Sequence, residues 1–544
     1  MAEQRSVLVC EKIGDSGLEL LRESGFDVEL GIDWDREELL ANVGRFEGLL
    51  IRSATNVDAE LLGCATKLKV VGRAGVGVDN VDVEDATKHG VIVANAPESN
   101  VVTAAEHTMA LLLSLARNVP QAHSALTEGR WERSEHTGVE LLDKTLGILG
   151  FGRIGQLVAS RARAFGMAVV AFDPFIGAER YRELGVTQAD NPEHLYAESD
   201  FITLHLPKTP ETEGWLNAEA FAQMKHGVRI LNVARGPLIV DEDLQAALDS
   251  GKVAGAALDV FQSEPLTDHP LFAYPNVIVT PHLGASTGEA TDRAGYQAAE
   301  QVVAALTGAS VTSAVNVPAV APEDLEVLGP FLPLCRQLGM LVAAIAEGGA
   351  VDRVEVEYFG RIAERDCRPL TTSVLLGLLE GRTDEAVNEV NAPSIVAKRG
   401  IVVSETSRTS ARDFTELVRV TQISGDESTR VVGTTLGRRH RPHLLELWER
   451  RFNLQLHEHL VLFQYEDVPG MIGHVGVVLG QNGINIENAA VGYDPDGDDD
   501  AAPATRAVMV LTTSTPVPPA VVAQVEEHPG IVTGRAVSLE SSSA

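Results

Sequence analysis

The stretch that decides the fold is LGILGFGRIG, residues 146–155. An apolar run typical of a buried strand enters a turn with glycines at its first, third and sixth positions, and a helical pattern follows. In a dinucleotide-binding turn, Gly150 lets the chain turn tightly, Gly152 lets the backbone approach a pyrophosphate, and Gly155 lets the helix pack closely on the strand. The first amides of the helix would then face the phosphates. The stretch therefore predicts a dinucleotide-binding site.

The residues beyond this turn support the same interpretation. AVVAF, residues 168–172, reads as a second strand, and Asp173 follows it directly. A carboxylate at this point accepts hydrogen bonds from the ribose hydroxyls and repels a 2′-phosphate, so the sequence predicts NAD rather than NADP as cofactor. A structural glycine turn without a cofactor stays the alternative, because GxGxxG alone is a weak signal.

The chain as a whole has the pattern of a large α/β protein. Its 544 residues predict about three or four domains, at roughly 100–200 residues each. Strand-like runs alternate with helical stretches up to residue 280, which predicts parallel sheets covered by helices. Long helices are predicted over 101–117 and 289–306. Residues 319–453 have weaker patterning, with a helix near 328–347, and a small α+β unit is expected from residue 460.

Charge and cysteine content limit the class of partner. The formal net charge of −33 is spread over the whole chain, which argues against nucleic acid, because a phosphate polymer would be repelled. General solubility and a cytoplasm of high salt concentration both explain this charge; scarce lysine and the run DPDGDDD, residues 494–500, favour the second. The 4 cysteines have no CxxC spacing, so neither a disulfide framework nor a metal site is predicted.

The N-terminus lacks the apolar core of a signal peptide, and no stretch approaches the roughly 20 apolar residues of a membrane span. We therefore expect a cytoplasmic protein that does not bind a membrane.

Arg235, Glu264 and His282 each stand at or just beyond the end of a predicted strand, where open α/β sheets hold their ligands. Oxidation of a 2-hydroxy acid needs these three groups. An arginine binds the carboxylate and polarises the carbonyl oxygen, a histidine takes the hydroxyl proton as hydride leaves, and a carboxylate orients the imidazole and stabilises its charged form. Each residue alone has a structural interpretation, as a surface Arg, a helix-capping Glu or a loop His. Together, behind a cofactor turn, they favour a dehydrogenase site.

The stretches that hold these residues resemble the D-isomer-specific 2-hydroxyacid dehydrogenases, and most closely their long-form 3-phosphoglycerate dehydrogenase branch. The resemblance covers essentially the whole chain. The matching stretches are RSAT at 52–55, GRAGVGVDN at 72–80, the glycine turn, NVARG at 232–236, SEP at 263–265 and PHLGAST at 281–287.

The resemblance implies a role for a larger set of residues than the pattern alone singled out. It implies that Arg235, Glu264 and His282 are the catalytic residues. It also implies an NAD site lined by Val76, Gly150, Gly152, Arg153, Ile154, Gly155, Asp173, Leu206, Val233, Ala234, Asp259, His282, Leu283, Gly284 and Ala285. The substrate's anionic end is expected at Arg52, Ser53, Arg73, Gly75 and Asn100.

The fold implied by the resemblance is α/β and discontinuous. A Rossmann-type NAD domain, residues 99–283, is expected to be inserted in a flavodoxin-like substrate domain, residues 1–98 and 284–317. An α+β intervening domain, 318–455, and an ACT-like regulatory domain, 456–540, are expected to follow. In the intervening domain, Arg438, Arg439 and Arg441 are candidates for a second anion site, and a solvated basic face explains them equally well.

The C-terminal unit resembles the ACT domain, a βαββαβ module that binds amino acids. The matching stretches are YEDVPGMI at 465–472 and GINI at 483–486. The resemblance implies L-serine as a possible effector, with Tyr465, Asp467 and Asn485 as its contacts. An ACT fold kept only for pairing subunits is the alternative. Because such modules often pair across subunits, we expect a homo-oligomer, a dimer or a tetramer.

The expected reaction is the oxidation of 3-phosphoglycerate by NAD to 3-phosphohydroxypyruvate, the entry step of L-serine synthesis. A substrate with both a phosphate and a carboxylate would account for two arginines outside the catalytic set. One alternative is a glyoxylate or hydroxypyruvate reductase or another D-2-hydroxyacid dehydrogenase, which seldom needs the two C-terminal domains. A more remote alternative is an NAD-sensing corepressor that binds proteins, and turnover of any 2-hydroxy acid would separate it.

Overall fold

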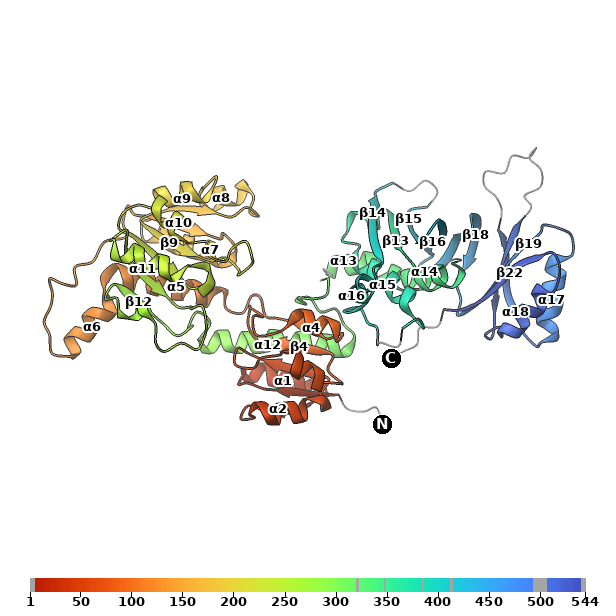
Figure 1. Ribbon diagram of the computed structural model, residues 1–544, viewed down its shortest axis with the longest axis horizontal. Helices are drawn as coiled ribbons and strands as arrows, with labels where there is room; N and C mark the ends of the chain where they lie inside the picture. Colours follow the sequence, from red (N-terminus) through yellow and green to blue (C-terminus); the bar gives the residue numbers. More distant parts are fainter. Residues whose placement is uncertain are drawn as a thin grey trace.

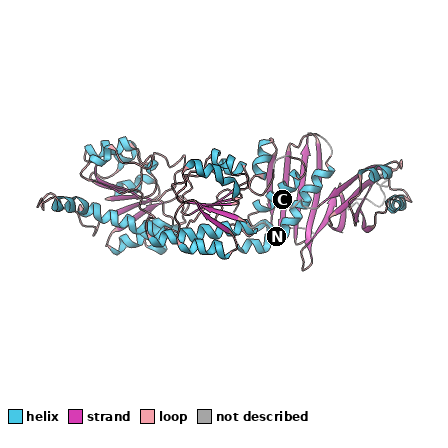
Figure 2. Cartoon of the chain, turned by 90° about the horizontal axis from the view of Figure 1, so that it is seen from below, coloured by secondary structure: helices cyan, strands magenta, loops and turns pink. Residues whose placement is uncertain are grey.

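The structure is a computed structural model of the chain and describes residues 5–318, 322–346, 349–383, 386–410, 414–492 and 506–539. Within these ranges the chain forms a 5-stranded, a 7-stranded, a 6-stranded and a 4-stranded sheet, each with helices against it. The 7-stranded sheet and the 4-stranded sheet lie at opposite ends of an elongated molecule (Figures 1 and 2). The acidic run at 494–500 lies outside the described residues.

The first domain is built on a parallel sheet in the order β2-β1-β3-β4-β5, which is the flavodoxin-like order and agrees with the substrate domain that the resemblance implied. Its central strands are fully buried because helices cover both faces, as parallel sheets require. The strands are β1 (Ser6–Val9), β2 (Asp27–Leu30), β3 (Gly48–Ile51), β4 (Val70–Arg73) and β5 (Ile92–Ala94). The helices are α1 (Asp15–Glu23), α2 (Arg36–Asn42), α3 (Ala59–Cys64) and α4 (Val83–Lys88).

The chain leaves this domain through α5 (Val101–Arg117) and returns through α12 (Gly288–Thr307). Helix α12 packs on α1, β3 and β4, so it closes one face of the first sheet. The contact with α1 is close because both helices present glycine: a Cβ on Gly17 would lie 2.7 Å from the Gly295 carbonyl carbon. In Figure 1 the green α12 ribbon runs along the first domain, between α4 and α1. The first domain is therefore assembled from two distant segments.

The second sheet is parallel in the order β12-β11-β10-β9-β6-β7-β8, a Rossmann-type arrangement with one added strand. Its order reverses between β6 and β9, and the glycine turn follows β6 at that point. Helix α5 packs against α7 on one face of this sheet. The strands are β6 (Thr145–Leu149), β7 (Ala168–Phe172), β8 (Thr187–Gln188), β9 (Phe201–Leu204), β10 (Val228–Asn232), β11 (Val253–Leu258) and β12 (Val277–Val279). The helices that follow the turn and cover the sheet are α7 (Arg153–Ala164), α8 (Ala178–Leu184), α9 (Pro192–Glu198), α10 (Ala218–Gln223) and α11 (Asp241–Asp249).

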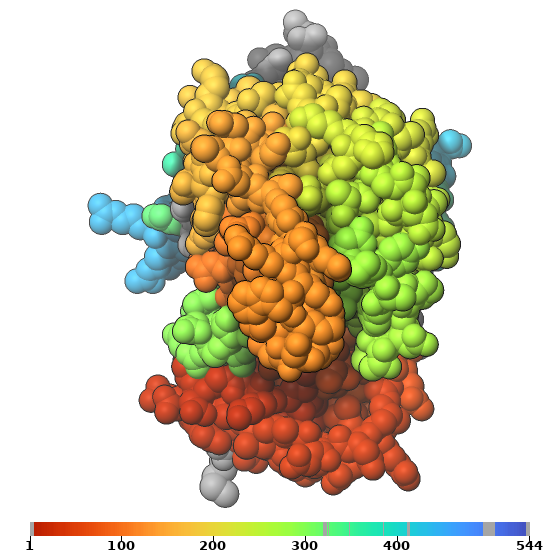
Figure 3. Space-filling model, turned by 90° about the vertical axis from the view of Figure 1, so that its left-hand side faces the viewer, coloured from red at the N-terminus to blue at the C-terminus, as the bar shows by residue number. Residues whose placement is uncertain are grey.

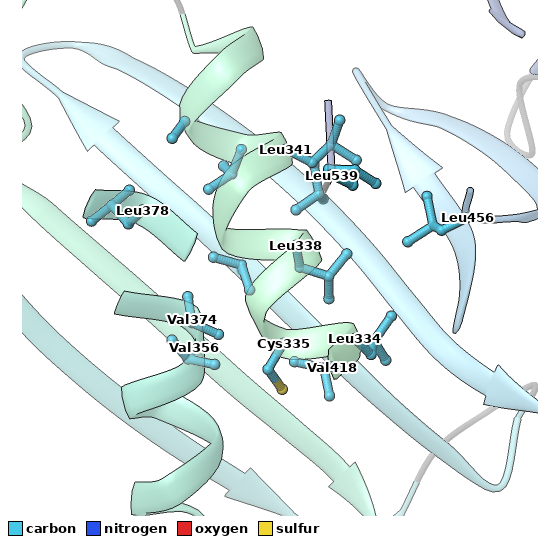
Figure 4. Close-up of a cluster of buried hydrophobic side chains, with 14 of the residues drawn as sticks. Leu334, Cys335, Leu338, Leu341, Val356, Val374, Leu378, Val418, Leu456 and Leu539 are labelled. Atoms are coloured by element: carbon cyan, nitrogen blue, oxygen red, sulfur yellow. The ribbon is translucent and has the colours of Figure 1, made fainter. Parts of the chain in front are cut away.

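The third sheet is mixed, in the order β14-β13-β15-β16-β17-β18. Helices α14 (Leu332–Ile345) and α15 (Arg368–Leu379) pack on one another and bury leucines against the sheet (Figure 4). The strands are β13 (Arg353–Gly360), β14 (Val402–Arg408), β15 (Glu416–Ser424), β16 (Glu427–Leu436), β17 (Arg441–Leu447) and β18 (Arg450–Gln455). Short helices α13 (Pro322–Leu328) and α16 (Ala392–Lys398) flank this core.

The helix expected near 328–347 is shorter than predicted. Pro330 lies in a 3₁₀ turn, Gly329–Phe331, and α14 begins only after it, because proline removes a backbone donor and disfavours a helical residue before it. The stretch Glu326–Ile345 does reach the length and apolar content of a membrane span, contrary to the expectation from sequence. Leu334 and Leu338 of this stretch are fully buried in the third domain, and Leu332 and Met340 are partly buried against the same core. Helix α14, which makes up most of this stretch, is the core helix of that domain.

The fourth sheet is antiparallel in the order β20-β21-β19-β22 and has the predicted βαββαβ sequence of elements. Its apolar core lies between the sheet and two helices. The elements are β19 (His459–Tyr465), α17 (Met471–Gln481), β20 (Ile486–Gly492), β21 (Ala507–Thr513), α18 (Pro519–Glu526) and β22 (Ile531–Ser538). The α/β fold class with parallel, mixed and antiparallel sheets is thus confirmed.

The contact between α14 and α15 generates a stability prediction. A Cβ on Gly339 would lie 2.1 Å from the Val374 carbonyl oxygen, and a Cβ on Gly377 would lie 2.0 Å from the Arg336 carbonyl oxygen. Each helix therefore needs glycine where it meets the other's backbone. We expect Gly339→Leu to force the helices apart and to destabilise this domain by about 1–3 kcal/mol or more.

Scanning calorimetry of the full chain checks this, with Gly63→Ala as the control. Gly63 lies in α3, and a Cβ there meets no atom within 4 Å, so that variant should leave every transition in place or raise it slightly. An unchanged thermogram for Gly339→Leu would show that the helices do not meet as described.

Candidate active site

The sequence-predicted catalytic and cofactor residues lie mainly at one edge of the second sheet. Arg235 follows β10, Asp259 and Glu264 follow β11, and His282 follows β12. The glycine turn follows β6 at the same edge. Parallel strands end together, and the loops beyond their carboxyl ends form the ligand crevice of open α/β sheets.

The glycine turn has the geometry that its sequence predicts. Gly150 has φ +90°, and a Cβ there would lie 2.5 Å from the His205 carbonyl oxygen. A Cβ on Gly155 would lie 2.3 Å from the Gly150 carbonyl oxygen, so the helix is pressed against the turn. A Cβ on Gly152 meets no atom within 4 Å. The backbone at the start of α7 is therefore open to a ligand, as a bound pyrophosphate requires.

Asp173 stands at the end of β7 beside this turn. Its Oδ2 accepts a hydrogen bond from the Phe151 amide at 2.9 Å, and its Oδ1 accepts one from the Phe175 amide at 2.9 Å. These bonds hold the carboxylate next to the glycine turn. Arg153, the first residue of α7, forms an exposed ion pair with Glu98 at 3.0 Å, and Ile154 and Gly155 follow it on the same helical turn.

The structure brings His282 and Glu264 into direct contact, with His282 Nδ1 and Glu264 Oε2 2.5 Å apart. Because a carboxylate oxygen is only an acceptor, the proton lies on Nδ1 and leaves Nε2 to accept another. Burial alone would raise the pKa of Glu264, but the hydrogen bonds from His282 and from the Phe261 amide outweigh it and the pKa is lowered. Glu264 is thus held as an anion beside the imidazole.

Arg235 reaches across to the first domain. Its Nε donates to Asp79 Oδ2 at 3.1 Å, and its Nη1 donates to the Ala234 carbonyl oxygen at 2.7 Å. A Cβ on Gly77 would lie 2.0 Å from Arg235 Nη2, so a larger residue there would displace the guanidinium. The loop of residues 75–79 therefore meets the second domain at Arg235.

The predicted substrate residues come from the first domain and from the start of α5. The Arg52 amide donates to Glu11 at 2.8 Å, which fixes the loop that also holds Ser53. Burial lowers the pKa of Arg73, and the nearby charge of Arg235 lowers it further. A Cβ on Gly75 would collide with the Arg73 guanidinium. Two arginines that repel one another mark a place where an anion would be stabilised.

Two of the predicted substrate residues have a buried side-chain atom without a hydrogen-bond partner among the described residues. They are Arg73 Nε and Asn100 Oδ1. Buried polar atoms are normally paired, so both are unusual in lacking a partner. Asn100 precedes α5 and does not cap that helix with its side chain.

The remaining predicted cofactor residues lie on the loops around the same edge. The Val76 carbonyl oxygen accepts a bond from Asn95 at 2.6 Å, and the Leu206 side chain lies against Gly150. Val233 and Ala234 follow β10, and Ala285 continues the turn that carries His282. Asp259 accepts bonds from the Leu283 amide at 2.7 Å and from the Gly284 amide at 2.8 Å.

Sequence reasoning missed several residues of this site. Asp79 stands inside the quoted stretch 72–80 but was given no role, and Glu11 has no signal in the sequence. His107 and Thr280 contact Asp259, each from another element. A histidine within an apolar helix pattern was the one available signal for His107, and its partner is 152 residues away.

The predicted effector residues of the fourth domain are not brought into contact by any described hydrogen bond. Tyr465 is buried in the domain core at the end of β19, and burial, followed by the charge of Asp467, raises its pKa. Asp467 and Asn485 are exposed, and β21 separates the strands beside them. Arg438 and Arg439 lie exposed in the turn between β16 and β17, and Arg441 Nη1 donates to Gln455 at 3.1 Å.

Family comparisons match three parts of the chain. Residues 109–284 match the NAD-binding domain of the D-isomer specific 2-hydroxyacid dehydrogenases. Residues 327–447 match the D-3-phosphoglycerate dehydrogenase intervening domain, and residues 459–530 match the ACT domain. The cofactor domain of this chain is therefore the NAD-binding domain of that family.

Whole-chain relatives and solved structures extend this assignment. The protein named D-3-phosphoglycerate dehydrogenase from Archaeoglobus fulgidus is 39% identical over 534 residues, which cover 98% of this chain and 100% of the relative. The protein of that name from Bacillus subtilis is 41% identical over 98% of this chain and 99% of its own length.

Solved structures of the wider family match a smaller part of this chain. A Thermus thermophilus protein matches with a TM-score of 0.53 at 38% identity, covering 57% of this chain and 99% of that one. The D-lactate dehydrogenase of Escherichia coli matches with a TM-score of 0.51 at 28% identity, covering 57% and 100%. Because full-length relatives, an intervening domain and an ACT domain all match, this chain belongs to the D-3-phosphoglycerate dehydrogenase family.

Proposed function

We propose that this chain oxidises 3-phosphoglycerate with NAD to 3-phosphohydroxypyruvate, the first step of L-serine synthesis. The observation that carries the proposal is the meeting of Arg73 and Arg235, from two domains, at the sheet edge that also holds the His282–Glu264 pair. Arg73 Nε and Asn100 Oδ1, both from the predicted substrate residues, are buried without a partner. A small substrate with two anionic groups would satisfy both the charges and the unpaired atoms.

In the proposed mechanism Arg235 binds the substrate carboxylate and Arg52 and Arg73 bind the phosphate end. His282 Nε2 takes the proton of the 2-hydroxyl as the hydride leaves carbon 2, and Glu264 stabilises the imidazolium that forms. NAD supplies the hydride acceptor. The glycine turn and Arg153 would hold its pyrophosphate, and Asp173 its ribose. The balance is one substrate and NAD⁺ to one 2-oxo acid, NADH and a proton.

We assign the domains by packing. Residues 1–98 and 284–317 form the proposed substrate domain, because α12 packs on the first sheet. Residues 99–283 form the NAD domain, because α5 packs on α7 and the second sheet. The intervening and ACT domains are assigned to 318–455 and 456–540.

We further infer an oligomer that responds to L-serine through its ACT domain. Apolar side chains on and after α6 (Val119–Thr127) support self-association: Leu126 is 57% exposed and Trp131 is 82% exposed. This orange segment projects at the front of Figure 3. Free cysteines, three of them buried, are typical of a reducing compartment and support a cytoplasmic location.

A D-2-hydroxyacid dehydrogenase without phosphate specificity is the second candidate. A glyoxylate reductase from Paecilomyes thermophila matches at 28% identity with a TM-score of 0.53 and covers 58% of this chain. The match to the intervening domain at 327–447 favours the phosphoglycerate reading.

The substrate assay separates these candidates. We expect NADH formation from 3-phosphoglycerate to exceed that from D-lactate or D-glycerate by about a hundredfold or more in kcat/KM, because each anionic contact to an arginine strengthens binding by about 1.5–3 kcal/mol. Arg73→Gln should reduce this preference. L-serine, added at low and at molar salt, should lower the rate. Equal turnover of the unphosphorylated acids would agree with the dehydrogenase mechanism but would contradict the proposed preference for 3-phosphoglycerate.

The acid–base pair can be tested by substitution. We expect His282→Ala to lower kcat by about 10²–10⁴-fold, because the proton acceptor is lost. Glu264→Gln should lower kcat less, since the imidazole stays but its charged form loses the anion. Glu289→Gln, which removes an exposed carboxylate of α12, is the matched control and should turn over normally. Near-normal kcat in His282→Ala would contradict the acid–base assignment.

The ribose contact predicts cofactor preference. Asp173→Ala should lower the kcat/KM ratio of NAD to NADP by about tenfold or more, because both the ribose hydrogen bonds and the repulsion of a 2′-phosphate are lost. Initial rates with each cofactor measure the ratio. Asp190→Ala, at an exposed carboxylate of the same domain, should leave the ratio unchanged. An unchanged ratio in Asp173→Ala would show that the carboxylate only holds the glycine turn in place and does not set the cofactor preference.

A further inference from the structure

The Asp259 carboxylate is the most densely hydrogen-bonded side chain near the proposed hydride-transfer site. Its residue is only 1% exposed. Oδ1 accepts from the Thr280 hydroxyl at 2.5 Å and from the Leu283 amide at 2.7 Å, and Oδ2 accepts from the Gly284 amide at 2.8 Å. Burial alone would raise the pKa of this carboxyl, but its donors outweigh burial and lower the pKa. A buried anion is therefore fixed directly behind the turn of residues 282–284.

This turn has a backbone that needs external support. His282 has φ +54°, in the left-handed region that side chains other than glycine rarely adopt. Its amide donates to the Asp259 carbonyl oxygen at 2.9 Å, and the next two amides donate to the Asp259 carboxylate. Main chain and side chain of one residue thus hold three successive amides. The direction of the His282 ring depends on this arrangement.

A histidine from another element completes the group. His107 lies on α5, and its Nε2 is 3.2 Å from Asp259 Oδ1 and 3.2 Å from Thr280 Oγ1. The Thr280 hydroxyl proton points to Asp259, and the carboxylate oxygen can only accept. Nε2 must therefore carry the proton that these two oxygens share. His107 donates to the anion that holds the catalytic turn.

We propose that His107 is a positioning residue for hydride transfer: its Nε2 fixes the Asp259 carboxylate, which fixes the backbone turn that aims His282 at the substrate hydroxyl. The inference rests on the proposed role of His282. On this proposal the rate of the reaction depends on a side chain of α5, the helix through which the chain leaves the substrate domain. His107 touches neither the His282 ring nor Glu264 through any described hydrogen bond, so its effect passes through Asp259.

The test uses the full-length enzyme and two replacements of His107. His107→Phe keeps a ring of similar size and removes the donor, whereas His107→Gln keeps an N–H donor at a similar reach. We expect His107→Phe to lower kcat with 3-phosphoglycerate by about tenfold to a hundredfold, the loss typical of a hydrogen bond to a charged group. KM for 3-phosphoglycerate should stay within about twofold, because the arginines are untouched. His107→Gln should restore most of kcat.

The control is Glu106→Gln, at the neighbouring position of α5. Glu106 is exposed, pairs with Arg161 at 3.3 Å and makes no described hydrogen bond to Asp259, so this variant should keep the wild-type kcat. Hydrogen exchange adds a readout independent of activity. Amides in segment 282–284 should exchange faster in His107→Phe than in Glu106→Gln, because the carboxylate that accepts their bonds is released.

A double-mutant cycle tests whether the effect of His107 on the rate passes through His282. In a His282→Asn background, His107→Phe should cause no further loss of the residual rate, because there is no base left to aim. An equal loss in both backgrounds, or normal kcat and exchange in His107→Phe, would overturn the positioning role. If His282→Asn itself keeps near-normal turnover, the proposed base assignment fails and this inference fails with it. If His282→Asn is nearly inactive and His107→Phe is fully active, the positioning role of His107 is excluded while the role of His282 as the base stands.

Discussion

The chain passes between two parallel sheets twice, and the candidate site depends on that double passage. Helix α5 carries it out of the first domain and α12 carries it back, and α12 then forms part of the first domain's core. The loops at the edges of both sheets consequently face one another. The Arg235–Asp79 ion pair, 156 residues apart in sequence, lies where they meet. A small substrate between the domains can thus be held by one sheet and transformed at the other.

The proposed substrate site gathers positive side chains although the protein as a whole is acidic. The chain has a net charge of −33, yet Arg52, Arg73 and Arg235 gather at the proposed substrate site. A local positive potential of this kind attracts a small dianion, and the surrounding acidic surface keeps large polyanions away. Arg73 Nε and Asn100 Oδ1 are buried without a hydrogen-bond partner, and such atoms are costly in isolation.

Much of the fold could be predicted from local patterns. The helix at 101–117 begins and ends where the sequence placed it, because apolar periodicity and flanking asparagines fix helices locally. Fewer elements of the third domain were predicted. Strand β14 is largely exposed and β16 is half exposed, so neither shows the clean alternation of a half-buried strand. Their positions follow from pairing with β13 and β15, which no local pattern records.

The sequence by itself determined the cofactor turn and the identity of the candidate catalytic groups. Gly150, Gly152 and Gly155 act within one short stretch, so their spacing carries the geometry. Tertiary structure decided which groups meet. The proton on His282 Nδ1 depends on Glu264, and the turn of His282 depends on Asp259 and, through it, on His107. These partners lie on separate strands and helices, and sequence spacing does not reveal them, because only the packing of whole elements sets the distances between them.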